Sequence, residues 1–169
     1  MKKIDTRKTA FLGILAALAM TLSFIEVLLP PLPMLPPGFK LGLANIAVMY
    51  AVFCLGFWQG IILSVIKSVF ILFVNGGYAF VLSMCGSIAA VLVMYLILKL
   101  FAKSSSYTAI SVAGAVAHNA MQIAAVCVIT KSAAALYYAP VLGIVSVLCG
   151  GATAAIVKIL IPVLKKINI

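Results

Sequence analysis

Most of this sequence consists of apolar runs, each close to the length that crosses a lipid bilayer as a helix. Six such runs follow one another, at about 8–29, 41–56, 59–74, 79–101, 108–130 and 138–164. A spanning helix needs about 20 mostly apolar residues. The chain is 66% hydrophobic and only 8% charged, whereas a soluble domain carries about a quarter charged residues. The sequence therefore predicts an all-α integral membrane protein, a single domain over residues 1–169 with six transmembrane helices.

The positive charges indicate the orientation of this bundle. A formal net charge of +10 would suggest nucleic acid binding in a soluble protein, but here the cations flank the apolar runs. They are Lys2, Lys3, Arg7 and Lys8 before the first run, Lys99 and Lys103 after the fourth, and Lys165 and Lys166 after the last. Cytoplasmic segments of membrane proteins carry such an excess. We therefore expect both termini in the cytoplasm, membrane lipid as the surroundings, and no nucleic-acid partner.

A polar cluster interrupts the fifth run, in the segment GAVAHNAMQI (114–123). His118 and Gln122 are four residues apart and share one face of a helix, and Asn119 lies beside them. Polar groups at membrane depth need a protein or aqueous neighbour. They either join helices by hydrogen bonds worth about 0.6 kcal/mol each or bind a ligand. The clustering of three such groups favours the ligand site.

Other polar residues are candidates for the same site. Lys67 lies near the middle of the third run, where a charge costs about 2.5–3.5 kcal/mol to insert; it either reaches back to an interface or faces the interior and binds the substrate. Lys40 and Asn45 open the second run and Asn75 follows the third. We assign all four to substrate binding, with Lys40 at the outer rim. Glu26 reaches the interface or neutralises Lys40 or Lys67.

The first run contains a candidate surface for a partner helix. Gly13 and Ala17 form a small-xxx-small pair, with Ala16 beside them. Small residues at this spacing let a neighbouring membrane helix approach closely. We therefore expect these three residues to form a partner interface.

Several kinds of chemistry are excluded by what the sequence lacks. No GxxxxGK[ST] loop is present, so the chain does not itself hydrolyse ATP. Asp5 and Glu26 are its only acidic residues, which excludes paired-carboxylate catalysis. One histidine and four scattered cysteines without a CxxC pair predict no metal, no disulfide and no cofactor.

Four segments carry a resemblance to a known family. They are PPGFKLGLANI, FVLSMCGS, GAVAHNAMQI and YYAPVLGIVSVLCGGATA. Together they resemble the Gx transporter family, also labelled heptaprenyl diphosphate synthase component I, over nearly the whole chain. The K-x-G-x-A-N-I and A-H-N patterns are the specific parts. That family is similar to the S components of energy-coupling factor (ECF) transporters, which capture a micronutrient outside the cell and dock on a T component driven by two ATPases.

The resemblance implies a function for the polar residues. It implies a non-enzymatic substrate-capture subunit in the bacterial cytoplasmic membrane, with T-component and ATPase partners. His118, Asn119 and Gln122 would line its cavity, with Lys67 nearby and Lys40 at the rim. Cations without matching acids suggest an anionic or polar-headed small molecule, and an isoprenoid or quinone precursor would fit the family label.

Two other functions remain open. The synthase label suggests prenyl chain elongation, but prenyl synthases bind Mg-diphosphate through aspartate-rich motifs and this chain has no DDxxD. A non-catalytic membrane partner in heptaprenyl diphosphate or quinone synthesis therefore remains the alternative. A purely structural membrane subunit would bind no ligand and would tolerate changes at His118.

Overall fold

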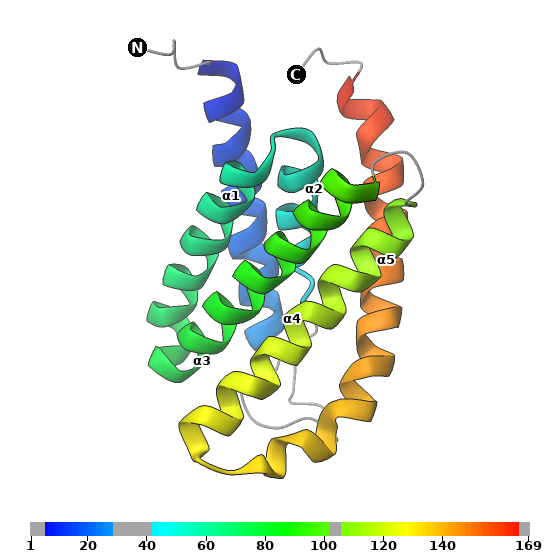
Figure 1. Cartoon of the computed structure of the whole chain (residues 1–169). Coiled ribbons are helices and arrows are strands. Elements are labelled where there is room, and N and C mark those ends of the chain that lie inside the picture. The colour runs from blue at the N-terminus through cyan, green and yellow to red at the C-terminus, as the bar shows by residue number, and fades with distance from the viewer. Residues whose placement is uncertain (1–5, 29–41, 102–105, 166–169) are drawn as a thin grey trace.

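The computed structural model describes residues 6–28, 42–101 and 106–165, with side chains as far as residue 160. Helices make up almost all of this part of the chain, and α1 begins at the same end of the bundle at which α5 ends (Figure 1). The elements are α1 (Thr6–Leu28), α2 (Asn45–Cys54), α3 (Phe57–Phe101), α4 (Tyr107–Thr130), the 3-10 helix η1 (Ala133–Tyr138) and α5 (Ala139–Lys165).

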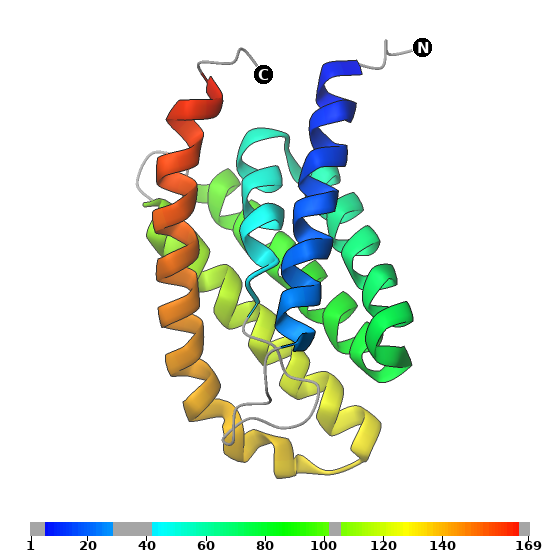
Figure 2. The same cartoon turned by 180° about the vertical axis from the view of Figure 1, so that it is seen from behind.

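The long helix α3 is a hairpin of two helical halves. Gly76, with φ 81° and ψ 177°, breaks the helix between them, and this backbone conformation is open to glycine because it has no Cβ. Contacts pair residues almost equally far on either side of Gly76: the Ser68 and Ser83 hydroxyl oxygens are 3.1 Å apart, and the Phe57 and Tyr95 ring centroids 4.8 Å. The two halves therefore pack side by side in opposite directions (Figures 1 and 2).

The predicted count of six spans is not reproduced. The described part of the chain has five α-helices, and four segments are long and apolar enough to cross a membrane, when the two antiparallel halves of α3 are counted as one. The helix α3 covers two of the predicted runs, and α2 has only 10 residues, or about 15 Å, against a hydrocarbon core of about 30 Å. The physical reason lies at Gly42 and Gly56, whose φ angles of 84° and 109° are not helical and confine α2 to the residues between them.

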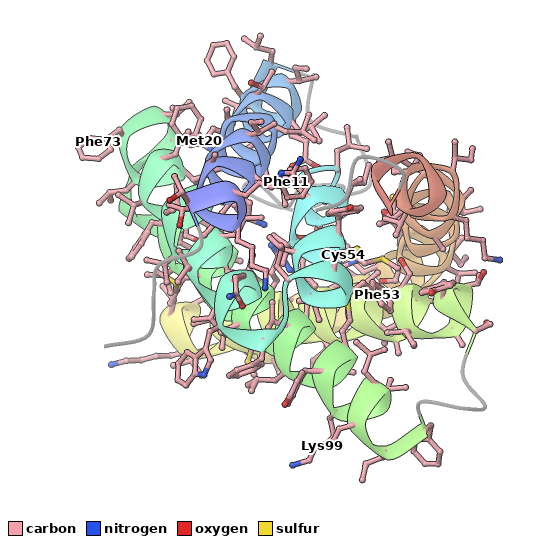
Figure 3. The ribbon with its side chains drawn as sticks, turned by 90° about the horizontal axis from the view of Figure 1, so that it is seen from above. Phe11, Met20, Phe53, Cys54, Phe73 and Lys99 are labelled. Carbon is pink, nitrogen blue, oxygen red and sulfur yellow. The ribbon has the colours of Figure 1, made fainter. Side chains whose placement is uncertain are left out.

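The short helix α2 is the core of the bundle. All residues from Ile46 to Val52 are buried, and a helix buried on every side must be apolar all round. The Phe11 ring of α1 packs edge-on against Tyr50 with centroids 5.6 Å apart. Seen from above, α2 lies among α1, α3, α4 and α5 (Figure 3). These neighbours, rather than its own length, hold α2 in place.

The outer surface of the bundle is apolar, and its interior contains polar groups. Large side chains such as Trp58 and Phe73 are 70% and 82% exposed, which suits contact with lipid. The buried polar side chains are Ser23, Ser64, Lys67, Ser68, Ser83, Ser87, Ser111, His118, Asn119, Gln122, Ser146 and Thr153. Polar side chains within a membrane protein are expected to face its interior, and several of these gather around two cavities.

Candidate binding site

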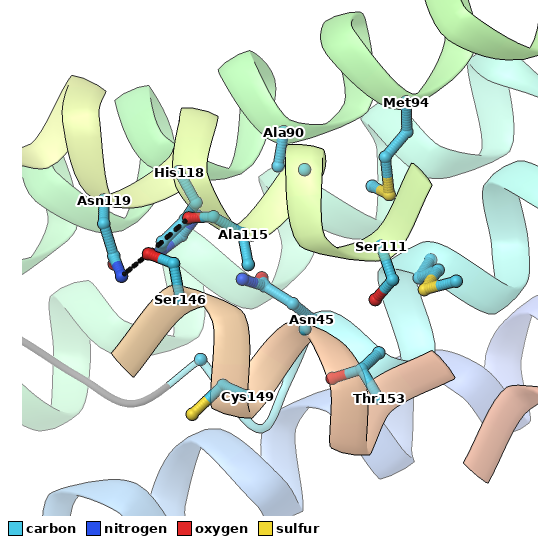
Figure 4. Close-up of a pocket in the computed structure, with 14 residues that line it drawn as sticks. Asn45, Ala90, Met94, Ser111, Ala115, His118, Asn119, Ser146, Cys149 and Thr153 are labelled. Atoms are coloured by element: carbon cyan, nitrogen blue, oxygen red, sulfur yellow. Dashed lines mark hydrogen bonds between the residues drawn. The ribbon is translucent and has the colours of Figure 1, made fainter. Parts of the chain in front are cut away.

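Two small cavities lie inside the bundle, and His118 forms part of the wall of both. The α5 cavity, of about 20 Å³, lies between α2, α3, α4 and α5 (Figure 4). It is lined by Gly42, Asn45, Met49, Ala90, Met94, Ser111, Gly114, Ala115, His118, Asn119, Ser146, Cys149, Gly150 and Thr153. The α1 cavity, of about 10 Å³, is lined by Ser23, Glu26, Gly42, Lys67, Ile71, Ala79, Ser83, His118 and Gln122.

His118 and Gln122 contact each other one turn apart on α4. Their Nε2 atoms are 3.2 Å apart, and the two side chains are only 4% and 2% exposed. Because an amide nitrogen donates and does not accept, His118 Nε2 accepts in this arrangement. Gln122 Oε1 and His118 Nδ1 are buried, and neither makes a hydrogen bond of normal geometry with the described residues, although the imidazole lies against the backbone of Gly86. Buried polar atoms are normally paired, so this pair has hydrogen-bonding capacity that the described residues do not use.

Gly86 of α3 lets the His118 ring sit between the helices. A Cβ at Gly86 would lie 2.8 Å from His118 Cε1 and 2.9 Å from Nδ1, closer than unbonded atoms approach. Any larger residue at this position would push the imidazole away from its present place. The absence of a side chain at Gly86 therefore helps to set the position of His118.

Lys67 turns inward and does not extend to an end of α3. It is 4% exposed, and its Nζ donates a hydrogen bond to Asn45 Oδ1 at 2.9 Å. Glu26 lines the same α1 cavity as Lys67, and its carboxylate accepts a hydrogen bond from the backbone nitrogen of Leu43. The expectation of cations without a matching acid is therefore not met, since a carboxylate of α1 lies at the cavity that contains the lysine.

Asn119 points toward α5. Its Nδ2 donates to Ser146 Oγ at 2.8 Å and lies 3.4 Å from the carbonyl oxygen of Leu142. Ser146 Oγ in turn donates to the Leu142 carbonyl oxygen at 2.6 Å and lies 3.4 Å from that of Ala115 (Figure 4). Asn119 lines the α5 cavity, and its amide nitrogen joins α4 to α5.

Some predicted residues lie away from the cavities. Asn75 is exposed beside the turn of α3 and lines neither cavity, and Lys40 lies outside the described residues. Gly13 and Ala17 are exposed on one side of α1, where a helix could pack. Ala16 is 7% exposed and belongs to the hydrophobic core, so the structure does not place it on the same surface.

Several residues that line the cavities were not predicted from the sequence. Ser146, Ser83 and Thr153 are single hydroxyl residues within apolar runs, and Met94 and Cys149 resemble ordinary core residues. A lone hydroxyl in a helix often bonds its own backbone one turn earlier, so only the neighbouring helices reveal such a residue as part of a site. Among the described residues there is no group of three His, Cys, Asp or Glu that could hold a metal.

The size of the cavities limits what they hold in this arrangement. Volumes of about 20 and 10 Å³ correspond to about one water molecule at most, whereas ligand pockets commonly measure about 300–1,000 Å³. A ligand therefore requires side chains or helices to move. Met49 and Met94 line the α5 cavity, and methionine side chains rearrange readily.

Comparison with a solved structure places the fold in a class. A protein described as the S component of a bacterial ECF transporter shares this fold with a TM-score of 0.69 and 19% sequence identity, over 98% of this chain and 99% of that one. The chain is therefore a helical membrane protein with an S-component-like fold. Residues 15–160 match the family model for heptaprenyl diphosphate synthase component I, and the chain belongs to that family. A comparison with curated proteins finds no significant match.

Proposed function

We propose that this protein is the substrate-capture subunit of an ECF-type uptake transporter. The observation that carries the proposal is the unused hydrogen-bonding capacity of the buried His118–Gln122 pair, in a fold shared with an S component. Polar side chains that only join helices would be expected to pair with one another. Buried and unpaired polar atoms at membrane depth instead support a ligand site.

The proposed site is centred on α4. His118 and Gln122 supply hydrogen bonds from one wall, and Lys67 and Asn45 form a bonded pair at the start of α2. Asn119 positions α4 against α5 through Ser146. Lys40 and Asn75 remain predicted contacts of a ligand on its way into the site.

The energy for uptake would come from partner subunits, because this chain has no nucleotide-binding loop. We propose that α1 docks on the T component through the exposed Gly13–Ala17 pair. A Cβ at Gly13 would meet no atom of the described residues within 4 Å, so we expect a larger residue at this exposed position to leave the fold intact. Ala16 is buried and would support this surface from behind.

Copurification tests this assembly. The protein is coexpressed with a T component and two ATPases of its source organism, as wild type and as the Gly13→Leu/Ala17→Leu variant. The matched control is Ala120→Leu/Ala124→Leu, an exposed pair on α4 with the same spacing. We expect the α1 variant to lose its partners while the control keeps them. Equal recovery of partners with both variants would contradict docking through α1.

A second candidate function follows from the family to which the chain belongs, whose description is heptaprenyl diphosphate synthase component I. In that function the protein would be a non-catalytic membrane partner of prenyl diphosphate synthesis. Copurification with a prenyl synthase subunit, and a change in the length of its product when the protein is added, would support it. Stable assembly with a T component and ATPases, without any effect on prenyl products, would contradict it.

A further inference from the structure

We infer that the site selects a ligand whose head group has no net charge and carries a hydrogen-bond donor beside an acceptor, as an amide, lactam or cyclic ureide does. This inference rests on the proposed function and chooses between the anionic and the uncharged polar head groups that the sequence left open. Three observations carry it: the charges at the α1 cavity, the bonding at the start of α2, and the His118–Gln122 pair.

The charges at the α1 cavity balance. Lys67 and Glu26 both line it, and no other charged residue of the described chain lines either cavity. A diphosphate head carries several negative charges and would need several cations to offset its loss of hydration. Among the described residues there is one lysine at the cavity, and a carboxylate at the same cavity matches its charge, so these residues do not provide them.

The backbone N–H groups at the start of α2 already donate hydrogen bonds to other groups of this chain. In transporters with broken helices, backbone N–H groups at such a helix start bind anionic ligands. Here the N–H of Leu43 donates to the Glu26 carboxylate, and the N–H groups of Asn45 and Ile46 donate to the carbonyl oxygens of Gly42 and Leu43. Glu26 thus takes the position where an anionic head group would bind, and its charge would repel one.

The His118–Gln122 pair offers the complementary groups of an uncharged head. With Gln122 Nε2 donating to His118 Nε2, the Gln122 oxygen and its second N–H are unused, while the His118 Nδ1–H lies against the backbone of Gly86. If the amide is turned around, an exchange that leaves its shape unchanged, His118 Nε2–H donates to the oxygen. The amide N–H groups and the Nδ1 lone pair are then unused. In both arrangements at least one donor and one acceptor remain.

Binding of probe molecules to the full-length purified protein tests this inference. The probes are uracil, which has adjacent donors and acceptors without charge; 1,3-dimethyluracil, the same ring without donors; and inorganic pyrophosphate. At ten times its Kd, uracil should shift the unfolding equilibrium toward the folded state by roughly tenfold, measured as a rise in Tm. Dimethyluracil and pyrophosphate should leave Tm unchanged.

Two variants connect the effect to the site. Gln122→Met should abolish the uracil shift, while Gln59→Met, the same change at a partly exposed residue that lines neither cavity, should retain it. Should Gln122→Met fail to fold, the ranking of the three probes on the wild type decides alone.

Failure of this inference is distinguishable from failure of the proposed function. No shift with uracil, or an equal shift with dimethyluracil, would overturn the inference. A rise in Tm with pyrophosphate would also overturn it, while leaving an anion-capturing subunit in place. Assembly with the T component and ATPases is measured without any probe, so it tests the proposed function separately.

Discussion

Adjacent glycines on α5 provide a direct test of how the helices pack. A Cβ at Gly150 would lie 2.7 Å from the Cα of Val112 and 3.2 Å from the carbonyl oxygen of Ser111, whereas a Cβ at Gly151 would meet nothing within 4 Å. Replacing each glycine by alanine therefore adds the same methyl group to the same helix. One methyl group meets the backbone of α4, and the other meets no atom of the described helices within 4 Å.

The magnitudes follow from two opposing effects. Glycine to alanine inside a helix stabilises by up to about 1 kcal/mol, and this gain applies equally at Gly150 and Gly151. Overpacking costs about 1–3 kcal/mol, with the upper part of the range expected at Gly150 because backbone cannot move aside as a flexible side chain can. We expect Gly151→Ala to stabilise by about 0–1 kcal/mol, and the two variants to differ by about 1–3 kcal/mol.

Unfolding in mixed detergent micelles measures both variants against the wild type under the same conditions. The comparison cancels helix propensity, so the difference between the two free energies of unfolding reports the contact between α4 and α5. Equal free energies for Gly150→Ala and Gly151→Ala would refute the close approach of these helices. The position of Gly150 in the lining of the α5 cavity would then be wrong as well.

Three further predictions concern α5, the turn of α3 and the orientation of the chain. Ser146→Ala should lower the free energy of unfolding by about 1–2 kcal/mol, because Asn119 loses an acceptor at 2.8 Å; an unchanged stability would contradict this bond. Gly76→Ala should cost about 1–3 kcal/mol, because its φ of 81° and ψ of 177° lie in a region that is essentially restricted to glycine, and a stability equal to the wild type would show that the turn has another conformation. With the native cysteines replaced, Asn75→Cys should react with an impermeant maleimide added outside, whereas Ser106→Cys should react only after permeabilisation; the reverse pattern would invert the proposed orientation.

The positions of the long helices followed from length and composition. The run at 8–29 corresponds to α1 at Thr6–Leu28, and the run at 108–130 to α4 at Tyr107–Thr130. These helices are predictable because a chain in lipid must satisfy its backbone within each segment. The shared face of His118 and Gln122 could likewise be predicted, because helical spacing alone places residues four apart on one side.

The partners of the polar groups were not predictable. The Glu26–Leu43 and Asn119–Ser146 contacts depend on how each helix is rotated about its axis. In a soluble bundle an apolar stripe reports that rotation, but helices facing lipid are apolar outside as well as inside. The ends of α2 could not be predicted from composition either, because the apolar run continues past Gly42 and Gly56, the glycines that limit the helix.

The shortness of α2 has a consequence for the order in which the protein is assembled. An apolar helix of 10 residues cannot be retained in a bilayer on its own, and its starting turn bonds to Glu26 of α1. Both α3 and α5 also contact α2, and α5 leaves the ribosome after α1, α2 and α3. During synthesis, α2 is therefore only partly buried, by α1 and the α3 hairpin, until α5 has been inserted and packs against it.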